Sequence, residues 1–221
     1  MPVLLQNIGP LALTFFRYNI VMTLSAVAIA LPIACLFAVG RLSRFPLVHL
    51  PVTAYVNVLR SSPLLMIMFW AYYTGPMLTG HPNSAYLSAL IALAAFEVAY
   101  FTEIVRAGLQ SIAVDQRSAG LATGLTTPQV MRLIVLPQAL WRMLPSLLTQ
   151  SIIAFQDSTI ASVIGVSDVL QSVTIINARD QRPIELYTAL AVGYFLVCYF
   201  GSRWVRRLEA VIQHRLQGAR A

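Results

Sequence analysis

Long stretches without charge constrain this chain most. The run from Tyr18 to Gly40 holds 23 residues without Asp, Glu, Lys or Arg, and the stretch from Ser61 to Phe96 holds 36. About 20 apolar residues in a helix cross the ~30 Å hydrocarbon layer of a bilayer. Only 10% of the 221 residues are charged, whereas a soluble domain has about 25%. The sequence therefore predicts an integral membrane protein and excludes an ordinary soluble enzyme or a long disordered segment.

Helix breakers divide the apolar sequence into spans. The long uncharged stretch is interrupted by Gly75-Pro76 and Gly80, so it must supply two helices. We expect an all-α polytopic protein, a single transmembrane domain over 1–221 with its core at about 18–207. The uncharged segment 158–167 is too short to span and is expected to be re-entrant or interfacial. Five transmembrane helices are predicted, at about 18–40, 54–74, 84–105, 133–155 and 186–202.

The distribution of basic residues predicts the orientation. All fifteen are Arg, and they cluster at the ends of apolar runs rather than on a soluble basic module, which argues against nucleic acid as a partner. Arginines gather on the cytosolic side of membrane proteins. We expect an external N-terminus and a cytoplasmic C-terminus, in a plasma (inner) membrane. Three arginines then lie outside (Arg17, Arg179, Arg182) and eleven inside (Arg41, Arg44, Arg60, Arg106, Arg117, Arg132, Arg203, Arg206, Arg207, Arg215, Arg220).

Motifs for catalysis, metal binding and nucleotide binding are missing from the sequence. Because the chain has no Lys, it cannot contain a Walker A motif, and its three His are too scattered to predict a metal site. Cys35 and Cys198 lie in apolar runs and are expected to be small apolar residues rather than a disulfide. We predict no cofactor. An intramembrane enzyme would need several acid or base groups in the spans, and Glu97 is the single in-span acid.

The polar segment of about 103–133 is long for a connection between spans, and such loops usually have a function. Asp115 is placed to be a helix N-cap, and Gly124 to end that helix in a left-handed conformation. Between them lie the small residues Ser118, Ala119 and Gly120. Thr127 followed by Pro128 predicts a second helix start. Two interpretations stay open on these grounds: a solvated surface loop, or a segment that a partner approaches closely.

The ionisable residues near the spans also allow two readings. Glu97 is costly inside a membrane, so it lines a functional cavity or pairs with Arg142 or a neighbouring hydroxyl. Tyr100 lies on the same helix face as Glu97. Arg142 is expected to reach the cytosolic interface, and Glu103 with Arg106 to form an ion pair at the end of the third span.

The loop and the start of the fourth span carry a resemblance. Ser118-Ala119-Gly120, three residues, Gly124, nine residues and Ile134-x-Leu136-Pro137 resemble the EAA loop of ABC importer permeases, in which Glu-Ala-Ala, Gly and Ile-x-Leu-Pro have the same spacing. Ser118 replaces the Glu and Gly120 replaces the second Ala. The resemblance implies that this loop forms a coupling helix that docks on a cytosolic ATPase. The residues implicated are Asp115, Ser118, Ala119, Gly120, Gly124, Leu136 and Pro137.

Further segments look like those of polar amino-acid permeases. They are Tyr55–Leu64, Phe96–Arg106, Pro137–Ala139 and Phe155–Thr159, and the resemblance covers about 18–207. In the last segment the family has Lys-Asp-Thr-Ser, whereas here Gln156 replaces the Lys and Ser158-Thr159 reverses the hydroxyl order. The combination is most similar to the glutamate and aspartate branch of the family. The carboxylate and hydroxyls at this external end of the fourth span either meet the ammonium group of a substrate or form a helix-terminal turn.

The resemblance implies the transmembrane subunit of an ATP-driven importer of type I fold that works by alternating access. Its expected partners are two cytosolic ATPase subunits, a second permease, identical or homologous, an external substrate-binding protein and membrane lipid. ATP hydrolysis belongs to the separate subunit. The expected substrate is a polar, acidic amino acid, with glutamine and basic amino acids as alternatives, and an intramembrane enzyme, channel or scaffold as weaker ones. The predicted pathway residues are Glu97, Tyr100, Gln156, Asp157, Ser158 and Thr159.

Overall fold

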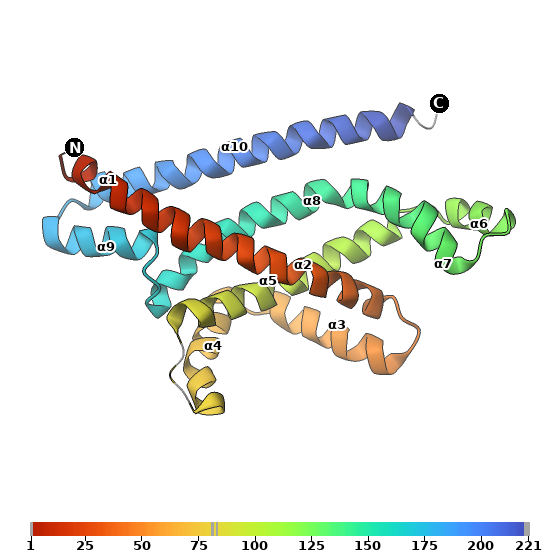
Figure 1. Cartoon of the computed structure of the whole chain (residues 1–221), viewed down its shortest axis with the longest axis horizontal. Helices are drawn as coiled ribbons and strands as arrows, with labels where there is room; N and C mark the ends of the chain where they lie inside the picture. Colours follow the sequence, from red (N-terminus) through yellow and green to blue (C-terminus); the bar gives the residue numbers. More distant parts are fainter. Residues whose placement is uncertain (1, 81, 83, 219–221) are drawn as a thin grey trace.

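The computed structural model describes residues 2–80, 82 and 84–218, with side chains described for 6–78, 80, 82 and 84–213. Arg220 lies outside the described residues, and the side chain of Arg215 is not described. The described part of the chain is helical and contains no strand (Figure 1). Its elements are α1 (Pro2–Thr14), η1 (Phe15–Ile20), α2 (Val21–Arg41), α3 (Pro46–Ser61), α4 (Leu64–Thr79), α5 (Ala85–Gln110), α6 (Val114–Ala122), α7 (Thr127–Val130), η2 (Met131–Val135), α8 (Leu136–Asp157), η3 (Ser158–Ile164), α9 (Val169–Asp180) and α10 (Pro183–Gly218).

The first helix is longer than predicted. α1, the π-helical segment η1 and α2 follow one another without a break, and Gln6–Arg41 is long and apolar enough to cross a membrane. The expected start at Tyr18 is therefore wrong. Arg17 does not end the helix; it lies inside η1, and the sequence before it is also apolar.

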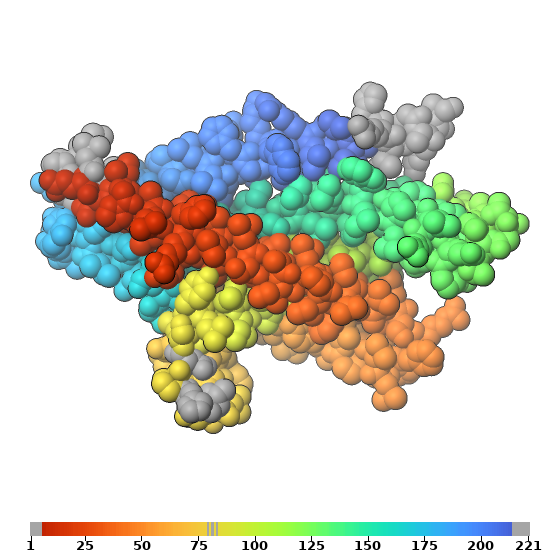
Figure 2. Space-filling model, viewed as in Figure 1, coloured from red at the N-terminus to blue at the C-terminus, as the bar shows by residue number. Residues whose placement is uncertain are grey.

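The second span is a bent pair rather than one helix over 54–74. α3 and α4 meet at 108°, at the break formed by Ser62 and Pro63. Both residues are extended, with ψ of 140° and 132°. A proline disfavours helical backbone in the residue before it, and this explains the position of the break. The first part of α4 packs against α5, while its far part projects from the rest of the molecule, as the yellow lower part of Figure 2 shows. Among the described residues, four helices are long and apolar enough to be spans, or five when the bent pair is counted as one.

α5 is the central helix, because α2, α3, α4 and α8 all pack against it. On α2 the alanines at positions 26, 30, 34 and 38 have no exposed surface and follow one another at four-residue spacing. Small residues in such a row allow two helix backbones to approach closely, which drives helix association in membranes, where apolar side chains gain little by leaving lipid. The row therefore accounts for the extensive α2–α5 contact.

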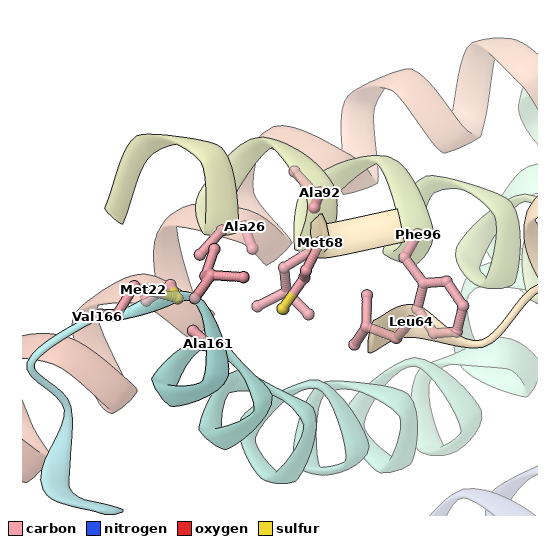
Figure 3. Close-up of a cluster of buried hydrophobic side chains, with 12 residues drawn as sticks. Met22, Ala26, Leu64, Met68, Ala92, Phe96, Ala161 and Val166 are labelled. Atoms are coloured by element: carbon pink, nitrogen blue, oxygen red, sulfur yellow. The ribbon is translucent and has the colours of Figure 1, made fainter. Parts of the chain in front are cut away.

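A second cluster joins α2, α4, α5 and η3. Figure 3 shows side chains from all four segments pointing toward one another. Met22 and Met68 at its centre are 1% and 0% exposed. Its labelled members are Met22, Ala26, Leu64, Met68, Ala92, Phe96, Ala161 and Val166.

The last three elements also differ from their predictions. The segment expected to be re-entrant or interfacial forms η3, a short 3₁₀ extension of α8 that ends at Gly165 in the left-handed region, with φ of 87°. α9 follows and lies beside α1 (Figure 1). α10 is a single 36-residue helix, longer than the predicted 186–202, because its arginine-rich end continues the helix instead of leaving it.

α5 and α8 are in close contact at Gly108. A Cβ atom there would lie 2.9 Å from the Cβ of Met143, so Gly108→Ala is expected to force the helices apart at a cost of about 1–3 kcal/mol. Thermal unfolding of the purified complex in detergent measures this as a lower midpoint. Gly193→Ala is the control, because nothing lies within 4 Å of a Cβ at Gly193. Equal midpoints for the two variants would contradict the close approach.

Candidate functional site

The polar loop contains the helix that its sequence predicts. α6 begins at Val114 with Ala113 as its N-cap residue, so the prediction of Asp115 as N-cap is wrong. Asp115 instead lies in the first turn, where a negative charge is favourable beside the positive end of the helix dipole. The helix starts earlier because Ala113 already has extended backbone, with ψ of 142°.

Gly124 ends α6 as predicted. Its φ is +84°, and it lies in a Schellman turn: the N–H of Gly124 donates to the oxygen of Leu121 at 3.0 Å, and that of Leu125 to Gly120 at 3.3 Å. The second helix start is displaced by one residue, because Thr126 rather than Thr127 is the N-cap of α7. Thr126 and Gln129 form a capping box there.

α6 has one inner face and a large outer surface. Gly120 is buried, and a Cβ there would lie 2.6 Å from Cδ1 of Ile134 and 3.0 Å from Cγ2 of Val130. This lack of space gives a physical reason why position 120 is Gly here, whereas the family that the loop resembles has Ala. Asp115, Ser118, Ala119 and Gly124 are exposed, as are the apolar Val114 and Leu121, at 74% and 49%. Leu136 and Pro137 are also exposed and form the first turn of α8.

Three polar contacts that sequence reasoning missed hold α6 and the end of α5 in place. Arg117 donates from Nη2 to the carbonyl of Leu109 at 2.6 Å. Gln138 of α8 donates to Gln116 at 3.2 Å. Arg142 donates to the carbonyl of Ser111 at 2.5 Å, immediately after α5. Arg142 is thus half-buried at this end of the molecule and does not pair with Glu97, and its position at the cytosolic interface stays a prediction.

Glu103 is the centre of an ionic cluster at the same end. Its predicted partner Arg106 is confirmed, with Nη2–Oε1 at 2.6 Å and Nε–Oε2 at 3.2 Å. Arg41 at the end of α2 also binds the carboxylate, and Nη1 of Arg60 lies 3.9 Å from Oε1. One acidic side chain therefore links α2, α3 and α5. Arg41 and Arg60 could not be predicted as its partners, because they lie far from Glu103 in the sequence.

Glu97 has a neutral partner within the spans. The residue is completely buried, and the amide of Gln150 on α8 donates to its two carboxylate oxygens at 3.2 and 3.4 Å. Sequence reasoning missed Gln150, although an amide inside the fourth apolar run was a visible signal for a buried partner of Glu97.

A cavity of about 420 Å³ lies between α5 and α8 and reaches the end of α3. Tyr100 and Gln150 line it, and the guanidinium of Arg60 lies 5.3 Å from the Tyr100 ring centroid, a cation–π geometry. Arg60, Ser146 and Arg142 add further polar groups to its wall. The cavity can therefore accept a small polar solute and offers it cationic, hydroxyl and amide groups, beside the carboxylate of Glu103.

The other predicted pathway residues lie elsewhere. Gln156 lines a groove between α8 and α10, where its Nε2 is 3.4 Å from Sγ of Cys198. Asp157 ends α8 and is partly buried. Ser158 is 1% exposed and bonded to Asn19, and Thr159 donates to the hydroxyl of Tyr194 at 2.7 Å. The six residues do not converge on one site. Tyr100 lines the cavity, and Glu97 is hydrogen-bonded to Gln150, which also lines it. Ser158 and Thr159 form hydrogen bonds to other helices.

The fold and the loop agree with what comparison with known proteins finds. Residues 30–214 match the family described as binding-protein-dependent transport system inner membrane component. The chain belongs to this family of transport subunits, whose members are not enzymes: it is an amino-acid ABC importer permease, an inner membrane component that works with a separate ATPase.

Individual relatives give the same result. The chain is 39% identical over 195 residues to the glutamate/aspartate import permease protein GltK of Escherichia coli O6:H1, covering 85% of this chain and 87% of the relative. It is 35% identical to the probable glutamine ABC transporter permease protein GlnP of Bacillus subtilis, over 76% and 78% of the two chains. A crystal structure of an amino acid ABC transporter with histidines superposes with a TM-score of 0.87, at 30% identity, covering 93% of this chain and 96% of that one.

The Glu97–Gln150 pair predicts a stability effect. Gln150→Leu leaves the buried Glu97 side chain without its amide donor and is expected to cost about 1–3 kcal/mol. The measurement is the thermal midpoint of the purified complex. Gln156→Leu makes the same change on the same helix at an exposed position and should leave the midpoint close to wild type. A Gln150→Leu midpoint no lower than that of the control would show that the pair contributes nothing.

Proposed function

We propose that this chain carries acidic amino acids, glutamate or aspartate, through the membrane. Identity to the glutamate/aspartate permease supports this substrate, and Arg60 at the cavity supports it chemically, because a guanidinium binds carboxylates well. Glutamine is the second candidate, because glutamine permeases are also relatives. The pathway that we propose runs from Asp157 past Glu97 and Gln150 to the cavity at Tyr100 and Arg60.

We propose α6 as the coupling helix, and the geometry of this loop is the single observation that carries the mechanism. Its exposed surface of small and apolar side chains offers a partner close contact, while Gly120 and the Schellman turn hold it against η2. ATP binding by two ATPase subunits would move two such helices, one from each permease, and alternate the access of the pathway. A second permease, identical or homologous, and an external binding protein that delivers substrate complete the proposed assembly.

The proposed orientation places α6 and the end of α10 in the cytoplasm and the N-terminus outside. The excess of arginines on that side supports it. So does the position of the ionic cluster and of Arg142 at the same ends of α2, α5 and α8 as the loop. Labelling of a cysteine introduced at Ala119 from the exterior of intact cells would refute the orientation.

Gly124 tests the coupling role. Gly124→Val places a β-branched residue at φ of +84° and should distort the loop, whereas Gly124→Asn is tolerated there because Asn adopts left-handed backbone more readily. Because nothing lies within 4 Å of a Cβ at this position, backbone strain and not a clash distinguishes the variants. The Val variant should lose substrate uptake and ATPase co-purification by about tenfold, corresponding to 1.4 kcal/mol or more. Wild-type uptake by that variant would refute the coupling role.

Arg60 tests the substrate class. Arg60→Gln removes the cation at the cavity and should raise the KM for glutamate uptake several-fold, and the KM for glutamine much less, since glutamine has one carboxylate fewer. Arg44→Gln is the control, because Arg44 is exposed and does not line the cavity. Uptake at a range of substrate concentrations in proteoliposomes measures both. An unchanged KM for glutamate would show that Arg60 does not take part in substrate binding.

A further inference from the structure

Three polar side chains meet at the end of α8 farthest from α6. They belong neither to the loop that contains α6 nor to the cavity at Tyr100. Asn19 belongs to the π-helical segment of the first helix, Ser158 to the start of η3 and Asp168 to the N-cap of α9. Each is 1% exposed. They are far apart in sequence, at separations of 139 and 149 residues from Asn19.

The side-chain amide of Asn19 is bonded on both sides. Its Nδ2 donates to Oγ of Ser158 at 3.3 Å and to Oδ2 of Asp168 at 3.2 Å, and its Oδ1 accepts from the backbone N–H of Val169 at 3.3 Å. The other carboxylate oxygen of Asp168 caps α9 by accepting from Gln171 at 2.8 Å. A buried polar group costs much free energy unless it is bonded, so these contacts are made together or lost together.

Further contacts near Asn19 connect the first helix to other segments at this end of the molecule. The rings of Phe15, Phe155 and Tyr194 pack pairwise with centroids 5.1–5.5 Å apart and connect η1 with α8 and α10. α9 lies against α1, as Figures 1 and 2 both show. π-helical turns inside α-helices are rare and are often found at functional sites. Asn19 is thus the polar contact by which the first helix holds the end of α8 and the start of α9.

We propose that Asn19 is a positioning residue of the transport cycle, which ties the outer end of α8 and the start of α9 to the first helix so that these parts move as one unit. α8 extends about 33 Å from the end of the loop that contains α6 to Ser158. A displacement at α6 can therefore reach the outer end through one helix. The hydrogen bonds of Asn19 transmit that displacement to the outer elements, and the movement of these elements opens or closes the external side of the pathway. This inference depends on the proposed coupling role of α6.

The experiment compares Asn19→Ala with the exchange Asn19→Asp/Asp168→Asn in the complete complex, reconstituted in proteoliposomes. Uptake and ATP hydrolysis are measured on the same samples. Asn19→Ala should lower the amount of substrate taken up per ATP hydrolysed by about fivefold or more, the usual size of coupling between sites. The exchange places the amide donor on residue 168 and the acceptor on residue 19, so it should recover most of the ratio. A role in folding alone would lower the yield of protein without changing this ratio.

The control is Thr14→Ala, since the Thr14 hydroxyl donates only within its own helix, to the carbonyl of Leu11. An uptake-to-hydrolysis ratio of Asn19→Ala equal to that of the control overturns the proposal, and so does an exchange variant that folds but recovers nothing. Comparison with Gly124→Val separates the two ideas. If Gly124→Val keeps normal coupling, the coupling role of α6 fails, and the inference about Asn19 fails with it. If Gly124→Val loses coupling while Asn19→Ala keeps the ratio of the control, the inference about Asn19 fails alone and the coupling role of α6 stands.

Discussion

Close approach of helix backbones to α5 is the interaction on which this structure depends. In a bilayer, apolar side chains gain little by leaving lipid, so helices associate by packing where small residues allow it. The alanine row of α2 and the contact of Gly108 with Met143 are the places where this happens. The cavity, the ionic cluster and the loop that contains α6 are all positioned by the resulting group of α2, α3, α5 and α8.

The buried polar groups form a second level of organisation. Glu97 with Gln150 and Asn19 with Ser158 and Asp168 each connect different helices through buried hydrogen bonds. Such groups are costly to leave unpaired, so each network specifies one relative arrangement of its helices. Both networks include residues of α8 or of its η3 extension, which makes this segment the common element between the loop and the far end of the molecule.

The sequence predicted the helical class, the approximate spans and the loop geometry, because charge-free runs and glycine positions report local structure directly. Gly124 has the left-handed backbone that its spacing indicated. The sequence did not reveal partners distant along the chain. Arg41 beside Glu103, Gln150 beside Glu97 and Asn19 beside Ser158 are brought together by packing alone. The contacts of Ser158 and Thr159 with other helices were hidden for the same reason, because a hydroxyl that binds another helix has the same sequence signature as one that binds a ligand.

The length of α10 has a geometric consequence. A helix of 36 residues measures about 54 Å, whereas the hydrocarbon layer is about 30 Å thick, so several turns must stand in water. Its C-terminal end lies at the same end of the molecule as α6 in Figure 1, and it carries Arg203, Arg206 and Arg207 on its surface. The arginine-bearing end of α10 and α6 therefore lie at the same end of the molecule, and a partner docked on α6, as proposed, would meet this positive charge most favourably with acidic groups.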